Sequence, residues 1–304
     1  MIKVLGLGDN VVDKYMHTMT MYPGGNALNF AVYAKLFGYE SAYLGNFGDD
    51  NEAIYVYETI SSLGIDVSRC RFWKGENGAA RVKLVDGDRV FIGSNKGGIS
   101  NQHPLELTNI DKKYLVDYDI VHTSIFSHIE AQLPVIRKTV PFLSMDFSNY
   151  ASSDYLKKVC PYIDCASLSC GEDMPQEEIR SQIELIVSFG CRHIVIATRG
   201  GKGALVFVDG KMYRQSPCMV KAKDTMGAGD SFITCFLINY IDGMKYAVDF
   251  PERSGRFGIT TAQDYKDLIV KTSLYKAAVY ASHNCQLDGS FGFGKKFQEP
   301  ENIS

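Results

Sequence analysis

The sequence predicts an α/β fold of three layers, in which helices cover both faces of a mainly parallel sheet and a smaller sheet lies beside it. Short apolar runs rich in β-branched residues alternate along the chain with longer stretches of helical periodicity. Four glycines follow the helical stretches, as helix-ending glycines do: Gly38, Gly64, Gly190 and Gly243. The length of 304 residues, with 45% hydrophobic and 22% charged residues, suffices for a large buried core and excludes wholesale disorder.

The expected elements follow one another in a regular order. Five apolar runs are predicted as buried strands of the main sheet: residues 3–7, 41–44, 120–122, 142–145 and 193–197. Five stretches with apolar residues at helical spacing are predicted as helices: residues 26–37, 53–63, 177–189, 231–241 and 264–282. Because strands and helices alternate, we expect the strands to run parallel and the helices to cover both faces.

One part of the chain departs from this alternation. Residues 79–85 and 89–93 alternate in side-chain character on either side of Asp86-Gly87, a dipeptide typical of tight hairpin turns. Together with residues 14–22, this hairpin predicts a small sheet that projects as a lid. The expected organisation is therefore a single domain spanning 1–304, with a lid formed from about 14–22 and 79–100.

Two further segments are expected to lie at the surface. The stretch 249–262 carries one proline and two glycines among charged residues and is interpreted as an inserted loop. The tail after Gly289 is glycine-rich and polar, and we expect it to be peripheral.

Charge and composition exclude several classes of protein. The net charge of −3, from 32 Lys and Arg against 35 Asp and Glu, is too near neutral for an electrostatic nucleic-acid binder. The longest apolar run, 232–241, is half the ~20 residues that a membrane span requires. The first residues enter a strand without a targeting segment, and the eight cysteines show no metal-ligand or redox spacing. We therefore expect a cytoplasmic protein with neither nucleic acid nor membrane as partner.

The strongest chemical pattern is the segment 224–230, Asp-Thr-Met-Gly-Ala-Gly-Asp, directly before an apolar helix. The small residues Gly227, Ala228 and Gly229 leave backbone amides uncovered at the positive end of the helix dipole, which favours a phosphate-like anion. Asp230 lies in the first turn, where a carboxylate can accept a proton from an alcohol during phosphoryl transfer. The alternative is an ordinary glycine-rich helix start in which Asp230 only caps the helix.

A second pattern suits a polyhydroxylated ligand. Gly25 allows close approach of the backbone, and Asn26 and Asn29 lie three apart on neighbouring helical turns. Their amides both donate and accept hydrogen bonds, as sugar hydroxyls require. Asp13 follows the first strand, near the sheet edge where ligands of open α/β sheets bind. Each feature alone also fits helix capping or loop structure, but together they predict a sugar site.

Two weaker patterns follow later strands. Thr198, Gly200 and Gly203 belong to a glycine turn that suits a nucleotide phosphate or ribose, although such turns are common after strands. Ser169 and Glu172 offer a hydroxyl and a carboxylate three residues apart, which suits Mg²⁺ held through water or, equally, an ordinary surface.

Taken in order, these segments resemble the phosphofructokinase-B family of carbohydrate kinases, also called ribokinase-like. Residues 224–230 resemble its C-terminal signature, 24–26 its N-terminal glycine motif and 45–50 its G-x-x-G-x-D segment. The resemblance covers nearly the whole chain. It implies a ribokinase-like, Rossmann-type α/β/α sandwich with a β lid, and a kinase that uses ATP and Mg²⁺. Six segments are similar to the family members that phosphorylate fructoselysine: 8–13, 24–27, 88–91, 119–122, 146–148 and 224–232.

The resemblance also implies roles for individual residues. Asp230 would be the base, with Gly227, Ala228 and Gly229 as the anion hole. Asp13, Gly25, Asn26 and Asn29 would hold the sugar. Ser169, Thr198, Gly200, Gly203 and Asp224 would line the nucleotide site, and Glu172 would organise Mg²⁺ through water. Two departures are visible: Ser169 stands where the family has asparagine, and Asp146-Phe147-Ser148 lacks the arginine of the usual D-x-N-x-R pattern.

The leading expectation is phosphoryl transfer from ATP to a primary hydroxyl of a ketose-type substrate, the 6-hydroxyl of fructoselysine. Arg89 is a candidate to bind the carboxylate of such a ketosamine, or is a solvated lid residue. The alternatives are a kinase of another sugar or of a nucleoside, and a catalytically silent sugar- or nucleotide-binding regulator. A nicotinamide-dependent oxidoreductase rests only on an incomplete dinucleotide motif at 6–11. A lid of this kind could also join two copies of the chain in a homodimer.

Overall fold

A computed structural model describes residues 2–85, 88–149, 152–249, 259 and 261–298. The expected hairpin turn at Asp86-Gly87 and most of the expected loop at 249–262 lie outside the described residues. Among the helices that are described, none combines the length and the apolar character needed to cross a lipid bilayer.

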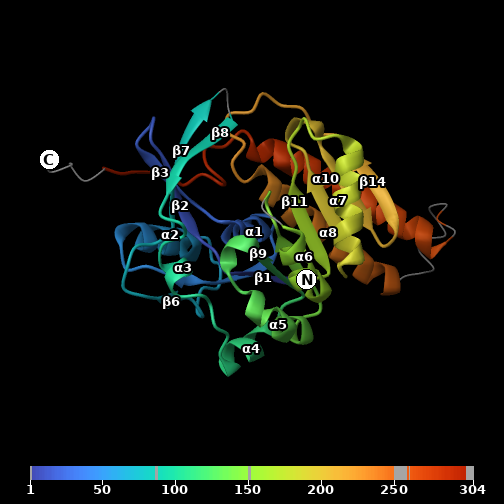
Figure 1. Ribbon diagram of the computed structural model, residues 1–304, viewed down its shortest axis with the longest axis horizontal. Helices are drawn as coiled ribbons and strands as arrows, with labels where there is room; N and C mark the ends of the chain where they lie inside the picture. The colour runs from blue at the N-terminus through green and yellow to red at the C-terminus, as the bar shows by residue number, and fades with distance from the viewer. Residues whose placement is uncertain (1, 86–87, 150–151, 250–258, 260, 299–304) are drawn as a thin grey trace.

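The described residues form a main sheet of eight strands in the order β14-β13-β12-β11-β10-β9-β1-β4 (Figure 1). The strands are β1 (Lys3–Leu7), β4 (Glu40–Leu44), β9 (Ile120–Ser124), β10 (Leu143–Asp146), β11 (Cys165–Ser169), β12 (Ile194–Thr198), β13 (Ala204–Val208) and β14 (Lys211–Gln215). Strands β4 to β12 of this order pair in parallel, and β13 and β14 are antiparallel additions at one edge. Each predicted strand is therefore present, and the parallel arrangement is confirmed.

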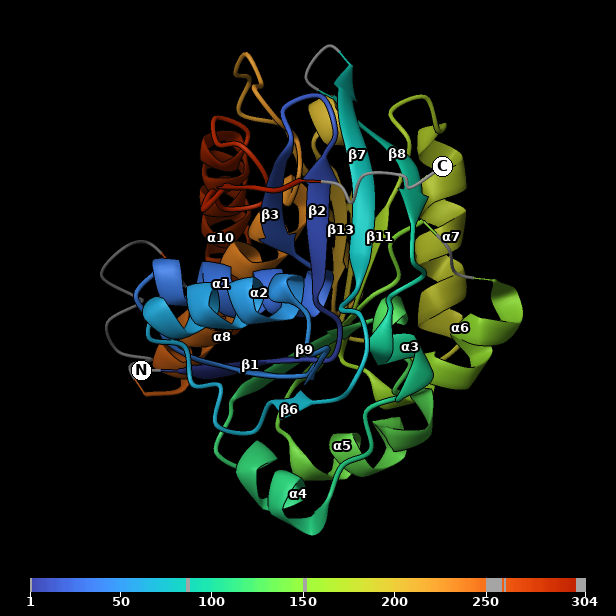
Figure 2. The same ribbon diagram turned by 90° about the vertical axis from the view of Figure 1, so that its left-hand side faces the viewer.

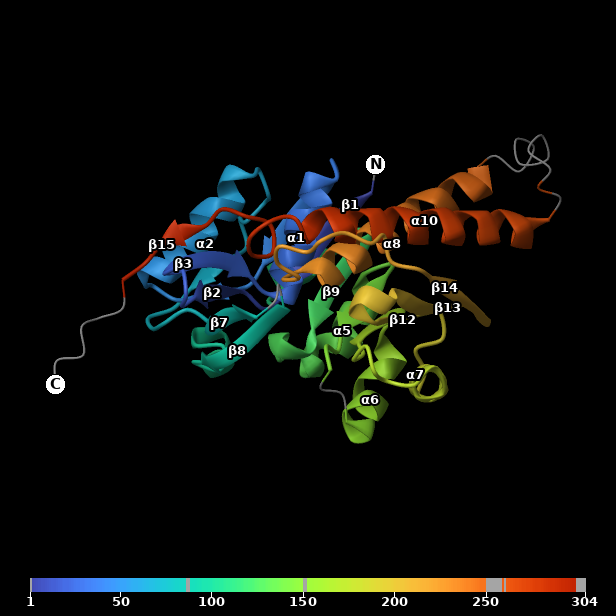
Figure 3. The same ribbon diagram turned by 90° about the horizontal axis from the view of Figure 1, so that it is seen from above.

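Helices cover both faces of this sheet. The helices of the described residues are α1 (Asn26–Leu36), α2 (Asn51–Ser62), α3 (Ile99–Gln102), α4 (Asn109–Leu115), α5 (Leu133–Thr139), α6 (Ser153–Val159), α7 (Gln176–Ser188), α8 (Ala228–Asp249) and α10 (Ala262–Asn284). Figure 3 shows α1, α8 and α10 on one side of the sheet and α5, α6 and α7 on the other.

Two apolar clusters hold these layers together. Leu5 and Leu7 of β1 belong to the cluster under α4–α7, whereas Val4 between them packs with α1, α8 and α10. Since successive strand residues point to opposite faces, β1 is buried on both sides and reads as a continuous apolar run. This pattern is the physical reason that the sequence predicts the three-layer fold, which is confirmed.

A second sheet of the described chain contains five strands in the order β15-β3-β2-β7-β8. They are β2 (Val11–Tyr15), β3 (Thr20–Gly24), β7 (Ala79–Val85), β8 (Asp88–Ser94) and β15 (Lys295–Lys296). Figure 2 shows β2, β3, β7 and β8 side by side, rising away from β1. We call these five strands the small sheet. A short parallel pair is formed by β5 (Asn46–Phe47) and β6 (Arg71–Phe72), and Figure 2 shows β6 below the small sheet.

Of the glycines predicted to end helices, three do so and one does not. Gly38, Gly64 and Gly190 have positive φ directly after α1, α2 and α7. Gly243 lies inside α8, so the prediction that it ends this helix is wrong. A Cβ at Gly243 would lie 2.8 Å from the side chain of Ile269. Gly243 therefore does not end the helix; it allows α8 to pack closely on α10.

The prediction that the tail after Gly289 is peripheral is also wrong. Ser290 and Phe291 are buried, and β15 pairs antiparallel with β3. The glycines of this segment serve close contact rather than flexibility, since a Cβ at Gly289 would lie 2.5 Å from the ring of Tyr22. The C-terminal segment 289–298 is thus part of the packed structure.

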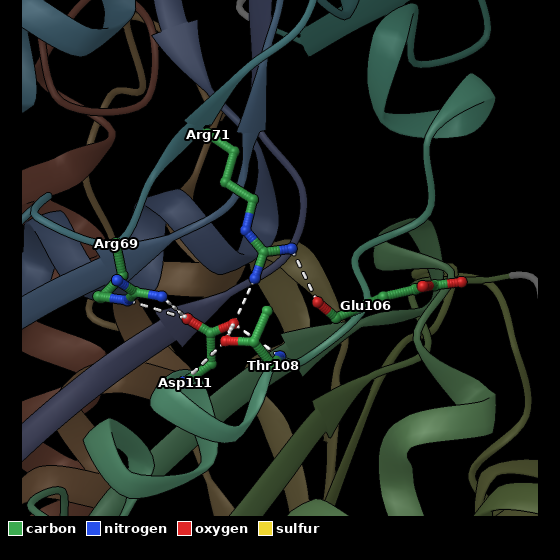
Figure 4. Close-up of polar contacts among 5 residues, drawn as sticks. All are labelled: Arg69, Arg71, Glu106, Thr108 and Asp111. Atoms are coloured by element: carbon green, nitrogen blue, oxygen red, sulfur yellow. Dashed lines mark hydrogen bonds and ion pairs between the residues drawn. The ribbon is translucent and has the colours of Figure 1, made fainter.

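A buried ion pair fixes the segment below the small sheet (Figure 4). The carboxylate of Asp111, fully buried at the start of α4, accepts from Arg69 Nε at 2.9 Å and binds Arg71. It also accepts from Thr108 Oγ1 at 2.7 Å, and Arg71 donates to the backbone oxygen of Glu106 at 2.7 Å. Two guanidinium groups and these hydrogen bonds hold the pKa of Asp111 below its ordinary value, against its burial. The pair therefore ties β6 to α4.

Candidate active site

Polar side chains gather where the parallel strands of the main sheet end. Asp9, Asp146, Ser169 and Thr198 lie at or just after the carboxyl ends of β1, β10, β11 and β12, which are joined through β9. The first turn of α1 meets the same edge, because the backbone amide of Asn26 donates to Asp9 Oδ2 at 2.7 Å. Ligands of open α/β sheets bind at this edge.

The first turns of α1 and α8 bring together two predicted site residues. Asn29 Nδ2 donates to Asp230 Oδ2 at 2.6 Å, although the two residues are 201 positions apart. Asp230 is partly exposed in the first turn of α8, and Asn29 is buried. The expected base and one expected sugar-binding amide are therefore direct neighbours.

Two glycines of the segment before Asp230, Gly227 and Gly229, have different surroundings. Gly227 has a φ of 71°, and a Cβ there would lie 2.3 Å from the hydroxyl of Tyr33. A Cβ at Gly229 would meet nothing within 4 Å. The helix begins at Ala228, whose backbone amide donates to the backbone oxygen of Thr225 at 3.3 Å, and the amide of Ser231 donates to the backbone oxygen of Gly227 at 2.9 Å. The positive end of the helix dipole makes this end of α8 suitable for an anion.

A cavity of about 460 Å³ adjoins this helix start. Its lining includes seven residues expected at the nucleotide and anion sites: Ser169, Glu172, Thr198, Gly200, Gly203, Ala228 and Gly229. The remaining wall comes from residues that sequence reasoning missed, chiefly 215–220 and the last turns of α10. The small apolar side chains of Ala278 and Ala281 on α10 leave room for a flat ring. Their spacing on a helix was visible in the sequence, but nothing there indicated which side they face.

Asp224 does not line this cavity. Its side chain is fully buried and accepts from the hydroxyl of Tyr15 at 2.6 Å and from the backbone amides of Met226 and Gly289 at 2.9 and 2.8 Å. Through these hydrogen bonds Asp224 connects β2, the glycine segment before Asp230 and the C-terminal segment 289–298.

Glu172 lies against the glycine turn at 200–203. Its Oε1 accepts from the backbone amide of Gly201 at 2.5 Å. Within the described ranges, no three His, Cys, Asp or Glu side chains are grouped to enclose a metal ion. One carboxylate beside a cavity is nevertheless the donor set that suits Mg²⁺, which keeps several waters and binds through one or two carboxylates plus phosphates.

Asp13 is the middle residue of β2 in the small sheet and is almost fully buried, so the prediction that it lies at the carboxyl end of the first strand is wrong. A Cβ at Gly24 would lie 2.5 Å from Asp13 Oδ2 and 3.7 Å from the hydroxyl of Ser290. Ser290 Oγ in turn accepts from Asn29 Nδ2 at 3.2 Å. Asn29 therefore links Asp230 to Ser290, and Asp13 and Ser290 both lie close to Gly24. Sequence reasoning missed Ser290 because its segment was interpreted as peripheral.

The start of α1 is capped by Asp9 and not by an asparagine. Besides the amide of Asn26, Asp9 accepts from the hydroxyls of Ser124 and Ser127 at 2.7 and 2.9 Å. Gly25 is the N-cap residue, with a φ of 114° that favours glycine. Asp146 accepts from the backbone amide of Ser148 at 2.5 Å and from Ser167 Oγ at 2.8 Å, and its burial raises the pKa of its carboxyl to about 6. In the sequence, Asp9 and Asp146 each follow an apolar run predicted as a buried strand. This position was the signal that could have identified both as site residues.

Arg89 belongs to β8, where it is paired with Leu84 of β7. The side chain of Arg89 lies outside the described part of the structure.

Comparison with known proteins agrees with this geometry. The model for the pfkB family carbohydrate kinase matches residues 2–264. The chain is 36% identical over 298 residues to the fructosamine kinase FrlD of Bacillus subtilis, covering 98% of this chain and 95% of that relative. It is 32% identical over 238 residues to fructoselysine 6-kinase of Escherichia coli, covering 78% and 89% of the two chains.

Solved structures show the same fold. A ribokinase from Giardia lamblia matches with a TM-score of 0.74 at 16% identity, over 96% of this chain and 95% of that one. A ribokinase from Arabidopsis thaliana, complexed with ribose and ATP, matches with a TM-score of 0.72 at 18% identity, over 95% and 94%. At these identities the likeness concerns the fold alone.

Proposed function

This chain belongs to the pfkB family of carbohydrate kinases and has their ribokinase-like fold, and we propose that its substrate is fructoselysine or a close ketosamine, phosphorylated on the 6-hydroxyl. As a carbohydrate kinase it transfers a phosphoryl group to an alcohol, and its kinase relatives imply ATP as the donor. Two relatives support a ketosamine substrate. One is named a fructosamine kinase and aligns over 98% of the chain, and the other is named a fructoselysine 6-kinase and aligns over 78%.

One geometric observation carries the proposed mechanism. Asp230 directly follows Ala228 and Gly229, which line the cavity, and its carboxylate accepts a hydrogen bond from Asn29 at 2.6 Å. In this mechanism ATP occupies the cavity and the sugar lies over Asp13, Asn26 and Asn29. The sugar hydroxyl gives its proton to Asp230 while its oxygen bonds to the γ-phosphorus, and the bond from that phosphorus to the ADP oxygen breaks. The backbone amides around the start of α8, from Gly227 to Gly229, stabilise the charge on the transferred group.

Mg²⁺ fits the nucleotide side of this site. Glu172 would hold it through water, since the amide of Gly201 already fixes one oxygen of this carboxylate and leaves the other available. The bound ion would neutralise phosphate charge during transfer. Ser169, in place of the family's asparagine, lines the same cavity.

The small sheet is proposed to act as a lid and as a dimer contact. Asp13 lies on β2 of this sheet, so the sheet stands next to the proposed sugar site. β8 has no neighbour on its outer side among the described strands, and Val90, Phe91 and Ile92 on it are exposed. An apolar edge strand of this kind favours pairing with a second copy.

Sedimentation of the parent protein is expected to give a mass of twice the 33.8 kDa of one chain. Sedimentation of the Ile92→Lys variant is expected to give the mass of a single chain. A monomeric parent protein would refute the contact.

The substrate is tested with the purified chain, ATP and Mg²⁺ against fructoselysine, fructose, ribose and a nucleoside. We expect kcat/KM for fructoselysine to exceed that for fructose by about 100-fold, because a site built for the amino-acid part leaves polar groups unpaired when that part is missing. Arg89→Ala is expected to raise KM for fructoselysine and not for fructose, if Arg89 binds the carboxylate. Preference for ribose or the nucleoside would overturn the ketosamine, and no transfer to any acceptor would indicate a silent regulator.

A further inference from the structure

Ser290 occupies the centre of the polar groups around the base. It is 1% exposed, and its hydroxyl accepts from Asn29 Nδ2 at 3.2 Å. The other hydrogen of the same amide goes to Asp230 Oδ2 at 2.6 Å. A single amide nitrogen thus joins the C-terminal segment 289–298 to the carboxylate in the first turn of α8.

The carboxylate of Asp230 fixes the orientation of the Asn29 amide. Nδ2 donates to both Asp230 and Ser290. The opposite amide orientation would put the oxygen of Asn29 against the carboxylate, which only accepts and would repel it, although the hydroxyl of Ser290 could then donate. In the observed orientation Oδ1 of Asn29 has no hydrogen-bond partner in the described chain. Leaving a buried acceptor unpaired has a free-energy cost, so the contacts of Nδ2 must outweigh it.

Ser290 is itself held rigidly. The hydroxyl of Tyr33, on α1, donates to the backbone oxygen of Ser290 and also contacts Asn284 Oδ1 at 2.7 Å. The neighbouring Gly289 donates its amide to the buried carboxylate of Asp224 at 2.8 Å. Farther along, β15 pairs with β3 of the small sheet, and in Figure 2 the red segment runs from the end of α10 to β3. The serine hydroxyl is therefore fixed relative to α1, the glycine segment and the small sheet.

We propose that Ser290 is a positioning residue for the phosphoryl transfer: through Asn29 it holds the carboxylate of Asp230 so that the oxygen not bound by Asn29 faces the sugar hydroxyl. This inference rests on the proposed function, in which Asp230 is the base. General-base catalysis needs the accepting oxygen within hydrogen-bond reach of the alcohol, and misplacement by about 1 Å costs up to ~100-fold in rate. Ser290 touches neither reacting atom, so its effect reaches the reaction only through Asn29 and Asp230.

The test is a double-mutant cycle between Ser290→Ala and Asp230→Asn. Ser290→Ala in the parent protein is expected to lower kcat about 10-fold, with KM for ATP unchanged within about twofold. In the Asp230→Asn background the same change is expected to alter kcat by less than about twofold, because no carboxylate remains to be oriented. Ser290→Cys keeps a weak hydrogen-bonding group of similar shape and is expected to recover part of the lost kcat.

A matched control separates positioning from packing. Ser41 is another buried serine that contacts α1, donating to the backbone oxygen of Ala31 at 2.5 Å, and it lies near the amino end of β4, whereas the site lies where the parallel strands end. Ser41→Ala is expected to lower the melting temperature without changing kcat.

The outcomes distinguish the two proposals. An Asp230→Asn variant with parental kcat would refute the base and with it the proposed mechanism. If Asp230→Asn is impaired but Ser290→Ala keeps the parental kcat, or lowers kcat equally in both backgrounds, the inference about Ser290 alone is wrong.

Discussion

Replacing Asp230 by asparagine is expected to lower kcat by about 1,000-fold while KM for ATP stays within about twofold of the parent. A positioned general base contributes roughly 10² to 10⁴ in rate, and asparagine cannot accept the proton. The substitution keeps the shape of the side chain and an oxygen that can still accept from Asn29, which donates at 2.6 Å. The geometry of the site should therefore survive while the chemistry is lost. Steady-state kinetics coupled to ADP release measure kcat, and calorimetry measures nucleotide binding.

The same variant decides between catalysis and capping. If Asp230 only caps α8, its replacement lowers the free energy of unfolding by about 1 kcal/mol and leaves turnover intact. Asp242→Asn, on the same helix farther from its start, is the matched control, for which we expect parental kcat. Parental turnover in Asp230→Asn with a lowered melting temperature would support the capping interpretation and contradict the base.

The sequence predicted the main fold because most strands are buried on both faces and are therefore continuously apolar. β11 was missed, although it lies in the middle of the sheet, because Cys165–Ser169 contains small and hydroxylic residues. The serine at 167 is buried within it and donates to Asp146 Oδ2 at 2.8 Å. A buried hydroxyl with a partner costs little, but in the sequence it resembles a surface residue. The antiparallel strands β13 and β14 were missed too, since no helix separates them from β12.

The sequence identified the chemical groups of the site more readily than their contacts. Glycine segments at helix starts indicate anion or sugar sites through local geometry alone, so Gly25 and Gly227 could be found one at a time. The contact of Asn29 with Asp230 spans 201 positions, and that of Asn29 with Ser290 spans 261. No local pattern reports such pairs. Polar glycine-rich composition made the C-terminal segment appear peripheral, because composition does not distinguish a flexible glycine from one that permits close packing.

Two glycines of the segment before Asp230 are expected to respond to alanine in opposite ways. Gly227 has a φ of 71°, and an added Cβ would lie 2.3 Å from the hydroxyl of Tyr33 and 2.9 Å from Cβ of Ser290. Gly227→Ala therefore combines the strain of a left-handed alanine with overpacking, each costing about 1 kcal/mol or more. We expect it to lower the free energy of unfolding by about 3 kcal/mol. Because Tyr33 and Ser290 must move, kcat should fall as well.

Gly229→Ala is the complementary change. Its Cβ meets nothing within 4 Å and enters the side of the segment that lines the cavity, while alanine favours helix over glycine by up to about 1 kcal/mol. We therefore expect an unchanged or raised melting temperature together with a KM for ATP about 10-fold higher, since the methyl group occupies space where a phosphate approaches the first-turn amides. Thermal unfolding and steady-state kinetics on the two variants measure both quantities. If Gly229→Ala leaves KM for ATP and kcat unchanged, the proposal that the phosphates approach α8 at Gly229 is wrong.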